Sequence, residues 1–341
     1  MGGMNYHIEI CFDDGIKWIA RVRRFNATSP PEALRDYIVQ SEVATLKLLE
    51  RTSVPAPEVF DLALDNPDNP VGVGYILMEK LHEKSLRWSA TTQEQRRKVM
   101  EQLADVFIEL SSYPFDRLGS LHYPGAGDIH IGALARESLT DFTESGMRTM
   151  GPFSSLKEYH ESSIRLILDL ILRGEMYSEQ AVDAYLIHRF LLDIVPIVLS
   201  QSVEDDGNFY LKHADDKGDH IMVDEDFNIT GIIDWEWAHT APPIHAFNSP
   251  IGLLPVGEFY QGKNNLGGDE ITFAHVLEEK GHTALAKYVW NGRLQHRFSF
   301  CCGYDLADWD GFLGLFQGLR GAVKVDEGVD WNGWKMAALH R

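Results

Sequence analysis

The sequence has few cysteines, no long apolar run and no recognisable targeting segment. Its three cysteines, Cys11, Cys301 and Cys302, include one adjacent pair, and this spacing suits neither a disulfide framework nor a zinc site. No stretch approaches the roughly 18 consecutive apolar residues that a membrane-spanning helix needs. The first residues lack the basic segment and apolar core of a signal peptide. We therefore expect a reduced, cytoplasmic protein with no membrane partner.

Basic residues are also scarce. The chain carries 31 lysines and arginines against 51 acidic residues, which gives a formal net charge of -20. Such a surface repels the phosphates of nucleic acids, so we expect no nucleic-acid partner. The acidic charge either serves only to keep the protein dispersed or attracts a cationic substrate. With 44% hydrophobic residues among 341, the chain can form a sizeable core.

The hydrophobic pattern predicts an α+β protein of two lobes. Alternating and continuous apolar segments predict strands at residues 7–12, 17–22, 59–64, 75–78, 220–223 and 229–233. Three- and four-residue spacing predicts helices at residues 31–50, 92–111, 156–173 and 178–199. We therefore expect a small strand-rich lobe over residues 1–81 and a larger helical lobe over residues 82–341.

The residues that can carry chemistry gather in the segment 211–237. Asp215 stands in a polar loop before the predicted hairpin, and Asp234 directly follows the second strand of that hairpin. This arrangement can place both carboxylates on the same side. One carboxylate could then orient a nucleophilic hydroxyl while the other holds a metal ion on phosphate oxygens.

The same segment resembles a known family. His213-Ala214-Asp215, followed later by Ile233-Asp234-Trp235-Glu236, is similar to the H-G-D-x-x-x-x-N loop and I-D-W-E motif of the aminoglycoside phosphotransferase and choline kinase-like family. The resemblance implies a protein-kinase-like fold. It also implies that His213 and Asp215 belong to the catalytic loop, with Asp215 as the catalytic aspartate, and that Asp234 binds the metal ion.

The predicted first lobe extends the resemblance, which covers about residues 2–250. Trp18-Ile19-Ala20-Arg21-Val22 resembles the strand that carries the phosphate-contacting base, and Glu42 stands where that base finds its carboxylate partner. The segment from Tyr75 to Glu79 resembles the hinge that meets adenine. The resemblance therefore implies a nucleotide site formed by Arg21 and Glu42 together with the hinge residues Met78, Glu79, Lys80 and Leu81.

The sequence departs from the family pattern at several positions. His220 occupies the place of the asparagine in the loop, Ala214 replaces the glycine, and Asp216 replaces an apolar residue. Imidazole is a poorer ligand than an amide oxygen for Mg²⁺ and a better one for Mn²⁺. His220 therefore either joins Asp234 as a metal ligand or marks a disabled site. The family's first strand and phosphate loop would precede Tyr6, so we expect them to be short or missing.

These observations predict an ATP-dependent phosphotransferase that acts on a hydroxyl of a small molecule, with Mg²⁺ or Mn²⁺ as its metal ion. One alternative is a catalytically impaired pseudokinase that serves as a binding or scaffold protein. Another is a metal-dependent hydrolase that uses His213, Asp215 and His220 as a cluster. The sequence leaves the identity of the small-molecule substrate open.

Overall fold

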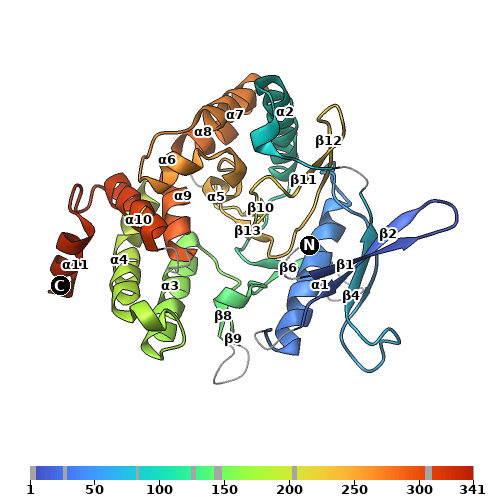
Figure 1. Ribbon diagram of the computed structural model, residues 1–341, viewed down its shortest axis with the longest axis horizontal. Helices are drawn as coiled ribbons and strands as arrows, with labels where there is room; N and C mark the ends of the chain where they lie inside the picture. Colours follow the sequence, from blue (N-terminus) through green and yellow to red (C-terminus); the bar gives the residue numbers. More distant parts are fainter. Residues whose placement is uncertain are drawn as a thin grey trace. The chain divides into compact units, whose positions relative to one another are not determined.

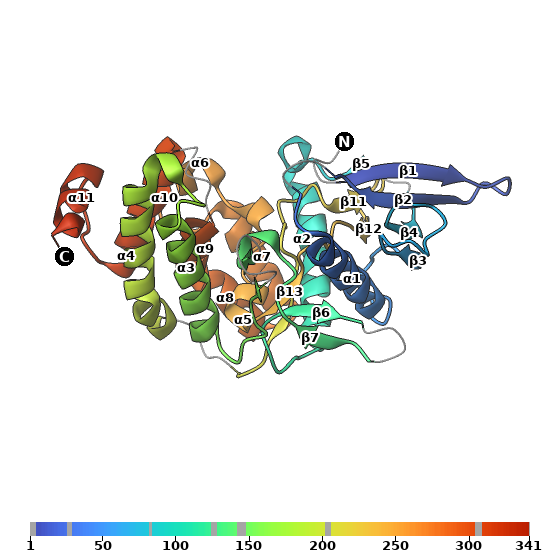
Figure 2. The ribbon, with the colours of Figure 1, turned by 90° about the horizontal axis from the view of Figure 1, so that it is seen from below.

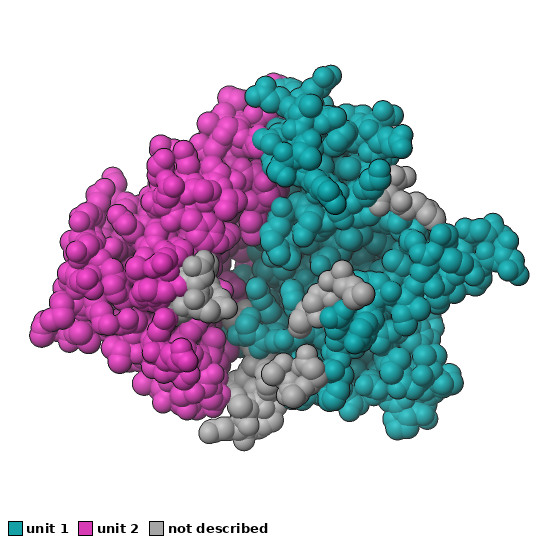
Figure 3. All heavy atoms as spheres, in the orientation of Figure 1, with its two compact units in different colours: residues 1–152, 210–241 teal, residues 153–209, 242–341 magenta. Residues whose placement is uncertain are grey.

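The computed structural model describes residues 5–25, 29–81, 84–123, 128–141, 148–201, 206–303 and 309–340. The chain divides into two compact units, which Figure 3 shows in different colours. Unit 1 comprises residues 1–152 and 210–241, and unit 2 comprises residues 153–209 and 242–341. The chain thus passes from unit 1 into unit 2, returns to unit 1 for residues 210–241 and then completes unit 2.

Unit 1 begins with a four-stranded antiparallel sheet in the order β1-β2-β4-β3 (Figure 2). Its strands are β1 (Asn5–Cys11), β2 (Lys17–Arg23), β3 (Val59–Ala63) and β4 (Tyr75–Glu79). The predicted turn between the first two strands is present: Gly15 adopts φ +88°, a conformation that favours glycine, and Phe12 N donates to Ile16 O at 2.9 Å. All four strands predicted for this region are confirmed.

Helix α1 (Glu32–Leu49) follows β2 and lies beside the sheet in both ribbon views (Figures 1 and 2). Leu34 and Ile38 are fully buried, as the helical spacing predicts, and Ile38 packs in a small cluster with Ala135. Glu42 is also buried, at 4% exposure. A buried carboxylate on a packed helix requires partners, and the sheet supplies them.

The rest of the first stretch of unit 1 holds one long helix and several short elements. Helix α2 (Gln93–Leu110) begins with a capping box between Thr92 and Gln95. The short elements are β5 (Lys84–Ser85), η1 (Trp88–Ala90), β6 (Ser120–His122), β7 (His130–Gly132), η2 (Glu137–Leu139), β8 (Thr140–Asp141) and β9 (Arg148–Thr149). Two two-stranded sheets result, β6-β7 and β8-β9.

The segment that returns to unit 1 carries four short strands. They are β10 (Tyr210–Lys212), β11 (Ile221–Val223), β12 (Ile229–Ile232) and β13 (His239–Ala241). The predicted hairpin of β11 and β12 is confirmed, and β5 extends it into a three-stranded sheet in the order β12-β11-β5. Strand β10 pairs with β13. Both ends of the segment are therefore tied together, and the polar loops lie between fixed strands.

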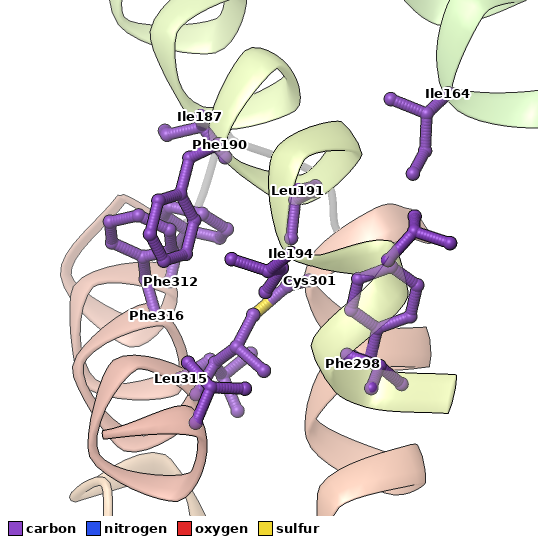
Figure 4. Packing of buried hydrophobic residues seen from close by; sticks show 14 of the residues in the cluster. Ile164, Ile187, Phe190, Leu191, Ile194, Phe298, Cys301, Phe312, Leu315 and Phe316 are labelled. Carbon is purple, nitrogen blue, oxygen red and sulfur yellow. The ribbon is translucent and has the colours of Figure 1, made fainter. Parts of the chain in front are cut away.

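Unit 2 is helical. Its elements are α3 (Leu156–Leu172), η3 (Ser178–Gln180), α4 (Ala181–Ser200), α5 (Pro243–Ala246), η4 (Ile251–Leu253), α6 (Val256–Tyr260), α7 (Gly268–Glu279), α8 (Thr283–Asn291), α9 (Arg293–Gly303), α10 (Trp309–Val323) and α11 (Trp331–Leu339). Its core joins apolar side chains of α3, α4, α9 and α10, among them Ile164, Leu191, Phe298 and Phe316 (Figure 4). None of the described helices is both long and apolar enough to cross a bilayer.

The predicted α+β architecture, strand-rich at the start and helical after it, is confirmed. The predicted helices correspond to α1, α2, α3 and α4, the last preceded by the turn η3. The predicted lobe boundary between residues 81 and 82 stays a prediction, and residues 82–83 lie outside the described part of the chain. Every predicted site residue belongs to unit 1.

Candidate functional site

His213 braces the loop between β10 and β11. Its Nδ1 accepts from the backbone N–H of Asp215 at 3.1 Å, and Nε2 therefore carries the hydrogen that reaches the Ile233 carbonyl at 2.9 Å. Burial lowers the pKa of His213, which keeps the ring neutral. The ring thus joins the loop that holds Asp215 to the strand end that precedes Asp234. His213 therefore braces this loop, and the catalytic role of the loop stays a prediction.

Asp215 presents a partly exposed carboxylate, with 35% of its side chain accessible. Lys217, two residues later, places its Nζ 3.0 Å from Asp215 Oδ2 and is itself 58% exposed. This hydrogen bond raises the pKa of Lys217, and the negative charges of Asp219 and Asp234 act in the same direction. The ammonium group of Lys217 therefore lies beside Asp215, the predicted base. This contact was not predicted from the sequence.

His220 lies directly before β11, and its ring is 4.3 Å from that of His213. Its Nδ1 accepts from Gly218 N at 3.2 Å, so the hydrogen of the neutral ring is on Nε2. Burial first, and then the nearby His213, lowers its pKa to about 3. In this arrangement neither nitrogen offers a lone pair to a metal ion. Ligation by His220 requires the ring to release Gly218, and its metal role stays a prediction.

Asp234 sits in a strained turn directly after β12. Its φ is +64°, and that of Trp237 is +65°; both angles are uncommon outside glycine. Trp235 anchors the turn, because its indole is buried and donates to the Ile232 carbonyl at 2.8 Å. The Asp234 carboxylate remains 56% exposed. An exposed carboxylate oxygen on a fixed turn is a suitable ligand for Mg²⁺ or Mn²⁺.

Arg21 of β2 meets three carboxylates. Its Nη1 pairs with Glu42 of α1, as predicted, and its Nη2 donates to Asp234 Oδ1 at 3.0 Å and to Glu236 Oε2 at 2.6 Å. Burial by itself would lower the pKa of Arg21, but Glu42, Glu236 and Asp234 together raise it above its ordinary value. Burial also raises the pKa of Glu42, which the charge of Arg21 opposes. The structure thus brings three predicted residues into direct contact.

Glu236 is a member of this cluster that sequence reasoning left without a role. It is 4% exposed and accepts from Asn5 Nδ2 at 3.1 Å, from Arg21 and from Arg23, which also pairs with Glu137. Arg23 had a signal in the sequence, because it stands two residues after Arg21 and so faces the same side of the strand. Glu137 had no such signal.

The predicted hinge residues lie at the end of β4. Met78 is buried at 8% exposure, Lys80 pairs with Glu9, and the Leu81 side chain packs on Gly231 of β12. The backbone N–H of Glu79 donates to Glu58 O at 2.8 Å. These residues connect the sheet to the hairpin of β11 and β12, and their contact with adenine stays a prediction.

One cavity in the described part of unit 1 lies at this cluster of arginines and carboxylates. A cavity of about 20 Å³, enough for one water molecule, is lined by Arg21, Glu42 and Glu236 among others. A larger hollow of about 820 Å³ lies between α1 and β3 and involves none of the predicted site residues. In the portion of the chain that is described, no group of three or more His, Cys, Asp or Glu side chains could hold a metal ion. The geometry therefore gives no support to a hydrolase centred on His213, Asp215 and His220.

These features define a class of protein. A strand-rich sheet, a helix whose glutamate pairs with an arginine of the sheet and the hairpin of β11 and β12 belong to an α+β, protein-kinase-like fold. The chain is similar to the gentamicin complex of APH(2″)-IIa, with a TM-score of 0.51, 12% identity and coverage of 93% of this chain and 91% of that one. A ternary complex of a thermostable mutant of aminoglycoside phosphotransferase APH(4)-Ia with ADP and hygromycin B has a TM-score of 0.49, 15% identity and coverage of 96% and 93%.

The family follows from the sequence match. The model of the phosphotransferase enzyme family, APH, matches residues 12–249, which is more than half of the chain. The chain belongs to this family of small-molecule phosphotransferases. A subtelomeric hrmA-associated cluster protein of Aspergillus fumigatus, found in two strains, is 33% identical over 125 residues, which are 36% of this chain and 23% of the relative. The aligned part therefore spans about a quarter of the length of these curated relatives.

Proposed function

We propose that this protein transfers the γ-phosphoryl group of ATP to a hydroxyl of a small molecule. The observation that carries the proposal is the pair of carboxylates held by the catalytic hairpin. Asp215 is braced through His213, and Asp234 is held in a strained turn and paired with Arg21. Catalysis of phosphoryl transfer rests mainly on positioning and on charge stabilisation, and these are the features that the cluster supplies.

Asp215 would act as the base. Its exposed carboxylate would accept the proton of the acceptor hydroxyl, whose oxygen forms a bond to the γ-phosphorus. The bond between the γ-phosphorus and the β–γ bridging oxygen breaks, and ADP leaves with that electron pair. The hydrogen bond from Asp215 N to His213 Nδ1 at 3.1 Å would hold the backbone of the loop that presents this carboxylate.

The ions and the nucleotide would be held by neighbouring groups. Asp234 would hold Mg²⁺ or Mn²⁺, joined by His220 if its ring releases Gly218, and the bound ion would offset charge on the phosphates. Arg21, fixed by Glu42, would steady the nucleotide phosphates through its positive charge. Residues Met78 to Leu81 would meet adenine.

The acceptor class follows the family. APH(2″)-IIa binds gentamicin in the complex that resembles this fold, so amino sugars are the first acceptors to test. The net charge of -20 also fits an acceptor that carries positive charge, as amino sugars do. Function does not follow from fold alone, so amino alcohols and neutral sugars belong in the same panel.

The experiment is ATP turnover by purified protein with each acceptor, in Mg²⁺ and in Mn²⁺, with GTP in parallel. Mass spectrometry of the acceptor should show a phosphorylated product that depends on ATP and on the divalent ion. Binding of nucleotide without turnover of any acceptor would instead favour the impaired, pseudokinase alternative. Absence of both binding and turnover would remove the proposal.

A further inference from the structure

The first strand of the sheet carries its polar side chains on the side that packs within unit 1. Arg21 of β2 pairs with Glu42 of α1, and this pair defines the packed side of the sheet. His7 lies opposite Arg21 in the ladder between β1 and β2. Glu9 shares the side of His7, because side chains alternate along a strand. The polar residues of β1 therefore point to the same side as the buried ion pair.

The apolar residues of β1 consequently point away from unit 1. An antiparallel sheet with one face in water normally places apolar side chains inside and polar ones outside, and β1 reverses this order. Tyr6 is 54% exposed and Ile8 is 55% exposed. Their cross-strand neighbours, and the next strand along, are apolar on this side as well. We call this side the apolar face; its side chains are Tyr6, Ile8, Ile10, Trp18, Ala20, Val22, Tyr75 and Leu77.

Aromatic rings extend the apolar face toward the turn between β1 and β2. Trp18 stacks on Phe60 of β3, with ring centroids 4.4 Å apart, and Phe12 meets Trp18 edge-on at 4.7 Å. Phe12 and Phe60 are themselves exposed, at 41% and 38%. Accessible aromatic side chains that lie together are typical of surfaces that bind another protein.

The apolar face has the dimensions of a small protein interface. Its strands are seven, seven, five and five residues long. With strands about 4.8 Å apart and residues about 3.3 Å apart, the flat extent is roughly 400 Å². The protruding aromatic rings add to this area and bring it toward the roughly 600 Å² per partner of a small specific interface. We therefore expect association of modest strength.

The charge pattern of the first hairpin favours a second copy of this chain as the partner. The whole chain has 51 acidic and 31 basic residues, but residues 5–25 have three acidic and four basic ones. Two copies can therefore approach here without the repulsion that the rest of the acidic surface would cause. Asp13 and Asp14 lie at the turn of the hairpin. Arg24 follows its open end, and its guanidinium lies over the Tyr6 ring, 4.6 Å from the centroid.

We propose that the protein forms a homodimer through the apolar face, with the two sheets packed face to face and the two β1 strands antiparallel. Two sheets packed about 10 Å apart bury the side chains between them. A two-fold axis across the strands places the acidic turn of each copy near Arg24 of the other, so the interface is self-complementary. Arg21 lies on the other side of the sheet, and the inference does not depend on the proposed function.

The test is the mass of the protein in solution, measured by sedimentation between about 1 and 100 µM. The wild type should approach twice the mass of one chain as its concentration rises. Ile8→Lys places a charge inside the interface without a partner and should raise the dissociation constant at least about tenfold. The matched control is Leu172→Lys at the end of α3, where the leucine is 70% exposed; this variant should dimerise as the wild type does.

A charge exchange tests the antiparallel arrangement. Arg24→Glu and Asp13→Lys should each raise the dissociation constant about threefold, because each brings like charges together across the two-fold axis. The double variant restores opposite charges and should return to the wild-type dissociation constant. Loss of folding would not produce this recovery, so the exchange decides the matter even if Ile8→Lys does not fold.

The contrary results are specific. A wild type that stays monomeric up to about 100 µM overturns the proposal and leaves the apolar face to a different protein partner. Equal effects of Ile8→Lys and Leu172→Lys on the dissociation constant place the interface elsewhere and also overturn it. A double variant weaker than both single variants overturns the antiparallel arrangement. None of these results bears on phosphoryl transfer, so the proposed function is tested separately.

Discussion

Arg21 Nη2 donates to Asp234 Oδ1 at 3.0 Å and so joins β2 to the turn that follows the hairpin of β11 and β12. The two residues are 213 positions apart in the chain. Asp234 has a left-handed backbone conformation, and two sets of contacts hold the turn in which it lies. Trp235 donates a hydrogen bond to the Ile232 carbonyl, and Arg21 pairs with Asp234 and with Glu236.

Removal of Arg21 should destabilise unit 1. Arg21→Ala leaves Glu42 buried without the arginine that pairs with it and leaves Glu236 with Arg23 as its cationic partner, and loss of one member of a buried ion pair costs about 3–5 kcal/mol. Urea unfolding should show this loss in the free energy of unfolding. Arg97→Ala, which breaks an exposed pair with Glu101 on a helix, should change that free energy by less than about 0.5 kcal/mol. Equal effects of the two substitutions would contradict the burial of the cluster.

Acid should destabilise the protein through its buried histidines. Burial lowers the pKa of His160 to about 3 and that of His188 to about 4, from an ordinary 6.5. Below pH 6.5 the unfolded chain takes up protons at these positions and the folded protein does not. Stability is therefore complete above that pH and falls as the pH drops toward the folded values, by about 1.4 kcal/mol per pH unit for each histidine.

His160→Leu provides the check of this slope. We expect the free energy of unfolding of this variant to fall less steeply than that of the wild type between pH 6.5 and pH 4.5. The difference in slope should be about 1.4 kcal/mol per pH unit, the contribution of one buried histidine. A slope that His160→Leu does not reduce would show that this ring is already charged in the folded protein.

The metal affinity should respond to His220. His220→Asn restores the family's amide, whose carbonyl oxygen suits Mg²⁺ and does not depend on the hydrogen bond to Gly218. We expect Mg²⁺ to bind this variant more tightly than the wild type, by about tenfold, in a titration that follows thermal unfolding. His220→Ala supplies the control, because it removes the ring without adding an oxygen. An Asn variant no better than the Ala variant would show that position 220 is not a ligand.

Gly119 should tolerate no side chain. It directly precedes β6, and a Cβ at this position would lie 2.1 Å from the backbone carbonyl oxygen of Gly132. Backbone cannot yield as a side chain does, so Gly119→Ala should cost about 1–3 kcal/mol of unfolding free energy. Gly257→Ala in α6 meets nothing within 4 Å and should be neutral or slightly stabilising. A neutral result at Gly119 would contradict the close approach of β6 and β7.

The long elements could be predicted from the sequence, because local pattern determines them. Alternation predicts β1 and β2, three- and four-residue spacing predicts α1, and the apolar segments around the turn at residues 224–226 predict the hairpin of β11 and β12. The pairing of Arg21 with Glu42 followed from the resemblance and is present. Their roles toward nucleotide stay predictions.

The missed features depend on tertiary contacts that have no local pattern. The strands β5, β10 and β13 are two or three residues long and exist because a distant segment pairs with them. Glu236 lies inside a recognised motif, but its three donors come from β1 and β2, far along the chain. Lys217 lies in the predicted loop, and only the structure shows that its ammonium meets Asp215.

The most direct test of the account is the yield of phosphorylated acceptor from ATP by the wild type and by Asp215→Asn, measured by mass spectrometry with the acceptor that the panel identifies. Loss of the base should lower kcat at least about a hundredfold with little change in the KM for ATP. Asp226→Asn, at the exposed turn between β11 and β12, should retain wild-type turnover. Turnover by Asp215→Asn at the wild-type rate would contradict the assignment of Asp215 as the base and with it the central claim.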